Sequence, residues 1–281
     1  MIIVKTIEEV RQVRWQQPQA AWGFVPTMGY LHEGHLSLVR AAKAENDKTA
    51  VSIFVNPTQF APTEDLSTYP RDLQRDLSLL KQEGVDMVFI PDDTTMYPPD
   101  FQTEIVIKKV TKPLEGASRP THFLGVATVV AKLFNIVQPH KAYFGQKDAQ
   151  QTVVVRQLVR DLNFPVDIVV CPIVREPDGL AMSSRNKYLS PEQRRAAVVV
   201  NKALRQAETA YRQGVRQGDI LRQLMADTIA AEPLARMDYV SAAYPDTLTE
   251  VDIAEEQVLL STAVFFGKTR LIDNILIDLS Q

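Results

Sequence analysis

Residues 20–35 read AAWGFVPTMGYLHEGH, and this stretch decides how the first part of the chain folds. The apolar run 20–25 predicts a strand and the apolar spacing over 36–44 predicts a helix, so a tight turn joins them. Gly29 and Gly34 lack a Cβ, so the backbone of this turn can approach a ligand closely. Unpaired N–H groups at the start of a helix attract anions, and two imidazoles beside them can donate hydrogen bonds to a reacting phosphate. The stretch therefore predicts a nucleotide site.

The two histidines of this turn, His32 and His35, allow other interpretations. Their spacing is compatible with a metal-binding pair on one helix face. The chain has only two other histidines, His122 and His140, and one cysteine, Cys171, so further metal ligands are hard to find. A solvated or cap-forming pair without chemistry is the remaining alternative.

The composition is typical of an ordinary globular protein. The chain has 281 residues, 45% hydrophobic and 23% charged, which is enough for a sizeable core without disulfides. A single cysteine cannot form an internal disulfide, which favours a reducing cytoplasm. The sequence shows no signal peptide or membrane-spanning run, and its net charge of −3 argues against a dedicated nucleic-acid-binding protein. We therefore expect a cytoplasmic protein that binds no membrane and no nucleic acid.

Strands and helices alternate in the first part of the chain, which predicts an α/β fold with a doubly wound parallel sheet. The expected strands are 21–25, 49–55, 86–90, 142–144 and 166–170, and the expected helices are 6–16, 35–45, 71–83, 123–137 and 149–162. The later part predicts helices 190–213 and 219–231, then strands 237–242, 257–266 and 269–277, which suit a small antiparallel sheet. We therefore predict two domains, residues 1–173 and residues 174–281.

Polar clusters follow several of the expected strands, at the sheet edge where ligands bind in this kind of fold. Lys147 can supply a point charge to a triphosphate, and Asp148 can bind Mg²⁺ or a ribose hydroxyl. Ser183, Ser184 and Arg185 offer two hydroxyls and a planar guanidinium, which suit phosphate oxygens. Plain structural turns remain an alternative for both clusters.

Four further polar residues have open roles. Gln59 and Gln151 are neutral amides that can hold the hydroxyls of a substrate, although each is equally compatible with a surface glutamine. Arg119 and His122 lie in a loop rich in turn-forming residues, which leaves a structural role as open as a functional one. The chain lacks a Walker P-loop, a GxGxxG and a GxSxG motif, so kinase, dinucleotide and serine-hydrolase interpretations are weak.

Over residues 6–277 the chain resembles the pantoate–β-alanine ligases. The resemblance is carried by the motifs PTMGxLHxGH at 26–35, FVNPxQF at 54–60, YPR at 69–71, FGxKDxQQ at 144–151, MSSRN at 182–186 and RLIDN at 270–274. It implies a Rossmann-like domain of the HxGH nucleotidyltransferase type, a smaller α+β C-terminal lid domain and a homodimer. It also implies that (R)-pantoate, β-alanine and ATP with Mg²⁺ give pantothenate, AMP and pyrophosphate through a pantoyl adenylate.

The resemblance also implies roles for individual residues, with His32, His35 and Lys147 as the catalytic ones. The ATP-binding residues would be Met28, Gly29, Tyr30, Leu31, His32, Glu33, Gly34, His35, Gly145, Gln146, Lys147, Asp148, Val174, Met182, Ser183, Ser184 and Arg185. Gln59 and Gln151 would bind pantoate, and Gln59 would then bind β-alanine. Asp76 is the candidate metal ligand, through its place after the YPR motif. Two departures from the family pattern matter little. The family often has Glu in place of Gln146, and Gly in place of Thr121, which leaves the role of His122 open.

Other functions remain open at this point. An adenylyltransferase would use the same histidine turn but retain AMP in its product. A fragment of a class I aminoacyl-tRNA synthetase would pair such a turn with a loop like 182–186. A non-catalytic nucleotide-binding protein is expected to lack at least one of His35, Lys147 and Arg185, and all three are present.

Overall fold

The computed structural model describes residues 1–62 and 64–279, and the chain divides into two compact units. Unit 1 comprises Met1–Gly145 and Val154–Pro172, and unit 2 comprises Gln146–Val153 and Ile173–Gln281. Part of the FGxKDxQQ motif therefore groups with the C-terminal residues. The domains predicted from the sequence, 1–173 and 174–281, stay a prediction, and the last two residues of the second lie outside the described part.

The described strands of unit 1 form one parallel sheet in the order β1-β4-β3-β2-β5-β6. These strands are β1 (Ile2–Val4), β2 (Trp22–Thr27), β3 (Lys48–Ile53), β4 (Met87–Phe89), β5 (Lys141–Gly145) and β6 (Asp167–Cys171). The strand order reverses between β2 and β5, so the predicted doubly wound sheet is confirmed. In such sheets a ligand binds at this reversal, beyond the carboxyl ends of the strands. The histidine turn follows β2, and the FGxKDxQQ motif begins at the carboxyl end of β5.

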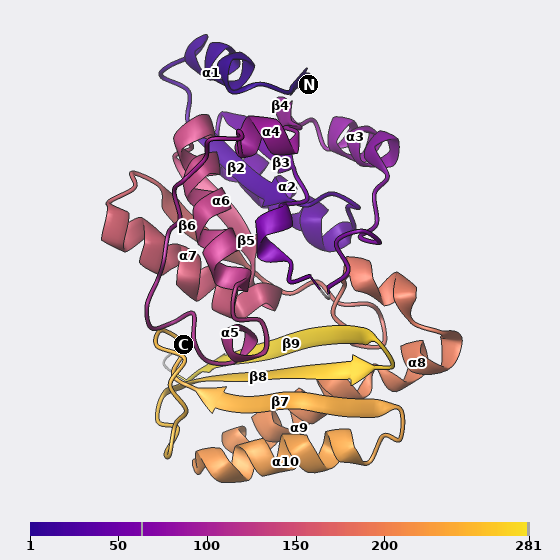
Figure 1. Ribbon diagram of the computed structural model, residues 1–281. Helices are drawn as coiled ribbons and strands as arrows, with labels where there is room; N and C mark the ends of the chain where they lie inside the picture. Colours follow the sequence, from indigo (N-terminus) through magenta and orange to yellow (C-terminus); the bar gives the residue numbers. More distant parts are fainter. Residues whose placement is uncertain (63, 280–281) are drawn as a thin grey trace. The chain divides into compact units, whose positions relative to one another are not determined.

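Five of the helices between these strands match the predicted ones to within two residues at each end, whereas the two four-residue helices were not predicted. The helices are α1 (Ile7–Trp15), α2 (Glu33–Glu45), α3 (Leu73–Gln82), α4 (Asp93–Met96), α5 (Glu115–Ser118), α6 (His122–Val137) and α7 (Ala149–Leu162), with the 3₁₀ turn η1 (Pro57–Gln59). The predicted capping box at Thr6 and Glu9 is present at α1. Figure 1 shows α6 in front of β2, and its almost wholly apolar sequence is buried. The edge strand β1 is missing from the prediction because three residues are too few to show a period.

Unit 2 contains the predicted antiparallel sheet, in the order β7-β8-β9. Its described elements are the 3₁₀ turns η2 (Gln146–Asp148) and η3 (Ser184–Tyr188), helices α8 (Pro191–Ala196), α9 (Val199–Arg212) and α10 (Gly218–Ala230), and strands β7 (Ala235–Ala243), β8 (Gln257–Phe266) and β9 (Thr269–Asp278). The prediction of one continuous helix over 190–213 is wrong. The helix is interrupted at Ala197 and Val198, where the Val200 N–H donates to the Ala197 carbonyl, three residues back, at 3.2 Å. The β-branched run 198–200 has low helix propensity, which favours this break.

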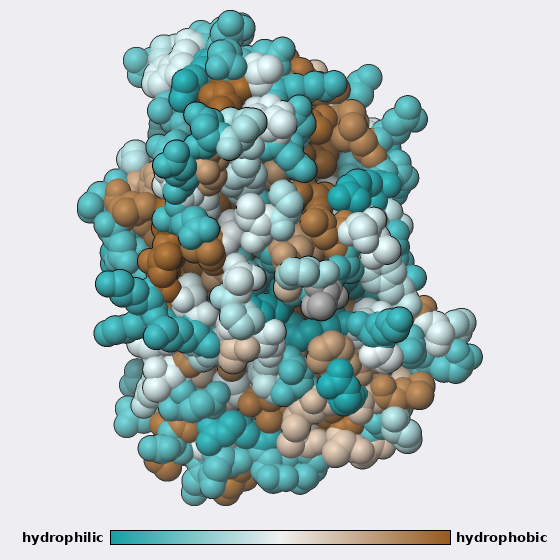
Figure 2. Space-filling view, viewed as in Figure 1, coloured by the Kyte–Doolittle hydropathy of each residue, from teal (hydrophilic) through white to brown (hydrophobic). Residues whose placement is uncertain are grey.

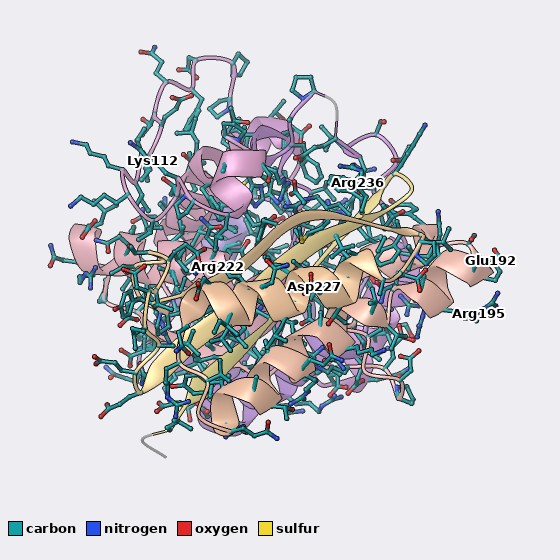
Figure 3. All side chains as sticks on the ribbon, turned by 90° about the horizontal axis from the view of Figure 1, so that it is seen from below. Lys112, Glu192, Arg195, Arg222, Asp227 and Arg236 are labelled. Atoms are coloured by element: carbon teal, nitrogen blue, oxygen red, sulfur yellow. The ribbon has the colours of Figure 1, made fainter. Side chains whose placement is uncertain are left out.

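Helices α9 and α10 lie side by side against the sheet of unit 2 (Figures 1 and 3). Leu221, Met225 and Ile229 repeat every four residues on α10 and are fully buried with Leu204 of α9. Arg222 and Asp227 are labelled on α10 in Figure 3. Apolar residues four positions apart form one face of α10 and charged residues the other, so the helix packs with its apolar face buried.

The surface shows no extended apolar region on the face drawn in Figure 2, where brown apolar residues form separate patches among polar ones. Separate apolar patches are common on the surfaces of folded proteins. None of the helices described here combines the length and the apolar character that crossing a membrane requires.

Candidate functional site

The histidine turn has a backbone that only certain residues can adopt. After β2 ends at Thr27, Gly29 (φ +81°) and Tyr30 (φ +52°) reverse the chain in the left-handed region. The φ of Gly29 favours glycine, and a Cβ there would also be crowded, 3.0 Å from Ile53 Cγ2 and 3.1 Å from Asp76 Oδ2. The Thr27 hydroxyl accepts the Gly29 N–H and donates to the Ser52 carbonyl, which ties the turn to β3.

A buried carboxylate holds the turn from beneath. Asp76, in the first turn of α3, is 1% exposed, and its two oxygens accept the N–H groups of Tyr30 (2.7 Å) and Leu31 (2.8 Å). Burial raises the pKa of this carboxyl, and the two backbone N–H groups oppose that shift. Arg75 donates to the Leu31 carbonyl at 2.8 Å, and its guanidinium lies 5.7 Å from the Tyr30 ring centroid. Both oxygens of the predicted metal ligand therefore bind backbone.

The histidines are oriented by the start of α2. His32 is the N-cap residue, and its Nδ1 accepts the Gly34 N–H at 3.2 Å. His35 Nδ1 accepts the His32 N–H at 3.3 Å, and the two ring centroids are 4.1 Å apart. An accepting Nδ1 carries no proton, so the hydrogen-bonding pattern assigns the proton of each neutral ring to Nε2. The two histidines therefore cap α2, as the cap-forming interpretation of the sequence expected. Because each Nδ1 accepts a backbone N–H, Nε2–H is the donor of each ring.

The side chain of Gln59 lies beside the histidine turn. Gln59, at the end of η1, is buried, its Nε2 lies 3.0 Å from Met28 Sδ, and its Oε1 accepts from Asn56 Nδ2 at 3.2 Å. Asn56 is 1% exposed, and its Oδ1 accepts the hydroxyls of Tyr97 (2.8 Å) and Thr58 (3.0 Å). The FVNPxQF motif contained Asn56, whereas no sequence signal pointed to Tyr97.

A glycine in α6 allows that helix to touch η1. A Cβ on Gly125 would lie 2.5 Å from the Thr58 carbonyl oxygen and 2.6 Å from the Gln59 nitrogen, which is too close for any side chain. Its carbonyl also accepts from Asn56 Nδ2 at 3.2 Å. Gly125 was not singled out from the sequence. An isolated glycine inside an apolar helix is nevertheless a signal of close packing, and it could have indicated this contact.

Arg119 and His122 lie close to Gln59, and His122 contacts its backbone. His122 Nδ1 lies 3.0 Å from the Gln59 carbonyl, and a carbonyl can only accept, so Nδ1 is the donor. Burial, reinforced by the nearby Arg119 charge, lowers the pKa of His122 to about 4. Arg119 binds both Glu64 oxygens, at 2.6 and 2.8 Å, and holds the pKa of that carboxyl below its usual value although burial acts to raise it. A neutral His122 therefore fixes the backbone of Gln59.

In unit 2, the η2 turn carries Lys147 and Asp148, with Lys147 Nζ 3.7 Å from Asp148 Oδ1. Asn274 of β9 donates to the carbonyls of Gln146 (2.9 Å) and Lys147 (3.0 Å). Gln151 lies half-buried in the first turn of α7. The structure therefore presents Lys147 on a backbone that is fixed by a neighbouring strand.

The second predicted anion site of unit 2, Ser183–Arg185, lies at the start of η3. Two antiparallel segments, 174–175 and 181–182, lead to it and are called the Val174–Met182 arms. Met182 N donates to the Val174 carbonyl at 3.0 Å, which joins the two arms. Ser183 caps η3, because its hydroxyl accepts the Arg185 N–H at 3.2 Å, and Ser184 is buried. Asn186 Nδ2 donates to the Ala181 carbonyl at 3.1 Å. The Ser183–Arg185 cluster is therefore an ordered turn on the same unit as Lys147.

The described side chains do not form a ready-made metal site. In residues 1–62 and 64–279, no group of three or more His, Cys, Asp or Glu residues is placed to hold a metal ion. Asp148 keeps an exposed carboxylate, and Asp76 uses both of its oxygens on backbone N–H groups.

Comparison with known proteins gives concordant matches along the whole chain. A family model described as pantoate-beta-alanine ligase matches residues 2–276. A pantothenate synthetase from Roseiflexus sp. (strain RS-1) is 60% identical over 278 residues, covering 99% of this chain and 100% of that protein. The crystal structure of a pantothenate synthetase from Thermus thermophilus has a TM-score of 0.94 at 47% identity and covers 98% of this chain and 99% of its own. A pantoate–β-alanine ligase from Francisella tularensis, complexed with β-γ ATP and β-alanine, has a TM-score of 0.82 at 39% identity and covers 98% and 97%.

Proposed function

The chain belongs to the pantoate–β-alanine ligase family, and on that premise we propose that it joins (R)-pantoate to β-alanine at the expense of ATP, with release of AMP and pyrophosphate. The observation that carries the proposal is the histidine turn, in which backbone contacts orient two Nε2–H donors at the N-terminus of α2. Such donors suit the negative charge that develops when a phosphate reacts. In this proposal, ATP is bound by the residues to which the family resemblance assigns that role, and pantoate by Gln59 and Gln151.

The first step forms pantoyl adenylate. Pantoate's carboxylate is ionised at pH 7, so one of its oxygens attacks the α-phosphorus of ATP without a general base. The bond to the bridging oxygen breaks, and pyrophosphate leaves with the electron pair. His32, His35, Lys147, Ser184 and Arg185 stabilise the charge on the phosphates, and positioning supplies much of the rate.

The second step transfers the acyl group. The amine nitrogen of β-alanine attacks the activated carbonyl, the carbon–oxygen bond to AMP breaks, and the nitrogen loses a proton. AMP therefore leaves with one oxygen that came from pantoate. Gln59 is suited to hold both substrates in turn, because its amide is fixed by Asn56 and its backbone by His122.

Magnesium enters this proposal with the nucleotide. Mg²⁺ prefers oxygen ligands and is commonly held by one or two carboxylates together with substrate phosphates. The described residues offer no cluster of ligands, and the 46% exposed side chain of Asp148, next to Lys147, would be the carboxylate that holds the ion together with the phosphates. The ion would supply positive charge to the triphosphate.

Two further properties are proposed with the function. A homodimer follows from the family resemblance, and sedimentation velocity should show a species of twice the 31.6 kDa chain mass. A reducing compartment such as the cytoplasm suits a chain whose one cysteine, Cys171, is buried and unpaired.

The activity is tested by incubating the protein with ATP, Mg²⁺ and pantoate, with and without β-alanine, and following the products by mass spectrometry. Pantothenate and AMP should appear only when β-alanine is present. A final product that still retains AMP when β-alanine is present would identify an adenylyltransferase instead.

Lys147→Ala should slow adenylation about 100-fold, because a cation is lost beside the triphosphate. The half-reaction that begins from preformed pantoyl adenylate should change less than about threefold, since pyrophosphate has already left. Rapid-quench kinetics of both half-reactions makes the comparison. Equal losses in both would assign Lys147 a structural role.

Gly125→Ala should raise KM for pantoate about tenfold, with a smaller change in KM for ATP, because the added Cβ must displace the backbone of Gln59. Gly214→Ala is the control, because Gly214 follows α9 outside the proposed site, a Cβ there meets nothing within 4 Å, and its φ of +105° makes the variant a test of lost stability alone. If Gly125→Ala changes KM for both substrates equally, the link between α6 and the pantoate site is wrong.

A further inference from the structure

The RLIDN motif at 270–274 has no part in the mechanism above, yet it contacts the nucleotide-binding residues of unit 2. Asp273 and Asn274 lie next to each other on β9, and they are 3% and 2% exposed. Strand β9 is in contact with both η2 and η3. Two buried polar side chains at such a place need a reason, because burying them costs free energy unless they are hydrogen-bonded.

Asn274 is fully engaged by η2. Its Nδ2 donates to the carbonyls of Gln146 at 2.9 Å and Lys147 at 3.0 Å, which uses both amide hydrogens. Its Oδ1 accepts from Gln146 Nε2 at 3.0 Å. The amide therefore fixes the backbone from which the Lys147 side chain extends, and no other residue type of this size offers two donors and an acceptor.

Asp273 is engaged by the other nucleotide-binding segment. Its oxygens accept both terminal nitrogens of Arg175, at 2.6 and 3.0 Å, in a bidentate ion pair. Arg175 also donates to the Gly179 carbonyl at 3.0 Å. Arg175 directly follows Val174, whose carbonyl accepts a hydrogen bond from Met182 N. The Asp273 carboxylate thus holds the arm that leads to Ser183–Arg185.

We propose that Asn274 and Asp273 are positioning residues for adenylation, which act by holding the Lys147 turn and the Val174–Met182 arms on one strand. Asn274 acts through Lys147, and Asp273 acts through Arg175. A lysine has four rotatable side-chain bonds, so a fixed backbone is needed for its ammonium to be in place when the phosphate reacts. The inference rests on the proposed assignment of Lys147 to ATP.

The test measures pantoate-dependent exchange between ATP and pyrophosphate in Asn274→Ala and Asn274→Asp, each in the wild-type and the Lys147→Ala background. Asn274→Ala should lose about tenfold in the exchange kcat. Asn274→Asp should lose at least as much, although it has the same shape, because a carboxylate faces two carbonyls without a donor. In the Lys147→Ala background either change should cost less than about twofold, since residues that act as a unit are not additive.

Ser241→Ala is the control for general damage to the sheet, because Ser241 is buried on β7 and its hydroxyl donates to the Glu250 side chain rather than to η2 or η3. Its exchange rate should match that of the wild type. Full additivity of Asn274→Ala with Lys147→Ala, or wild-type exchange in Asn274→Asp, would overturn the positioning role alone. Wild-type exchange in Lys147→Ala would instead refute the assignment of Lys147 to ATP, and the role of Asn274 with it.

Discussion

Replacing His35 with alanine should slow the formation of pantoyl adenylate about 10²–10³-fold, the usual loss when one donor to a transition state is removed. His35 Nδ1 accepts the His32 N–H, so the ring's remaining donor is Nε2–H at the N-terminus of α2. Single-turnover quench measurements with ATP and pantoate alone isolate this step. The half-reaction from preformed pantoyl adenylate should be affected much less.

Two conservative variants separate the two tasks of His35. His35→Asn retains an acceptor near Nδ1 and should preserve the cap but not the rate, whereas His35→Gln places an amide N–H near Nε2 and should recover part of the rate. His140→Ala serves as the control, because His140 Nδ1 likewise accepts a backbone N–H, that of Trp22, at 3.0 Å. Wild-type adenylation by His35→Asn would show that the ring only caps the helix.

Asp76→Asn should both destabilise the protein and slow adenylation about 100-fold. Asp76 accepts the N–H groups of both Tyr30 and Leu31. An asparagine has only one acceptor oxygen, so its NH₂ group would face one of these two N–H groups. Loss of one hydrogen bond to a charged group costs about 1.5–3 kcal/mol. The displaced turn would then misplace both histidines, and a shift of about 1 Å can cost about 100-fold in rate. Urea unfolding and single-turnover kinetics measure the two effects.

Asp72→Asn is the matched control on the same helix. Asp72 caps α3 by accepting the Arg75 N–H, and asparagine is an equally good cap, so this variant should behave as the wild type. Restoration of the Asp76→Asn rate by raised Mg²⁺ would show that Asp76 is a metal ligand, and the positioning role would then be wrong.

The sequence was sufficient for the architecture because its signals are local and repeated. Continuous apolar runs marked the buried parallel strands, and helical spacing marked α2, α3 and α7. The failures were of two kinds. The strand β1 has too few residues to show a period. The break between α8 and α9 falls in a run without glycine or proline, where only the low helix propensity of the β-branched residues 198–200 favours it.

Within the site, motifs located residues but not the contacts that hold them. The histidines and Gln59 were predicted, whereas the role of Asp76 arises from a contact 45 residues away in sequence, with Leu31. The link between Asn274 and Lys147 spans 127 residues. No periodicity or spacing rule reports such pairs, so these residues remained either unassigned or assigned to a metal.

The central claim is that an oxygen of pantoate's carboxylate becomes bonded to the α-phosphorus of ATP. The measurement that tests it most directly uses pantoate labelled with ¹⁸O in the carboxylate, unlabelled ATP and β-alanine, with mass spectrometry of every product. If the α-phosphorus is attacked, AMP should contain one ¹⁸O, the amide of pantothenate one, and pyrophosphate none. Label in inorganic phosphate or pyrophosphate, with none in AMP, would contradict the claim by showing that a different phosphorus is attacked.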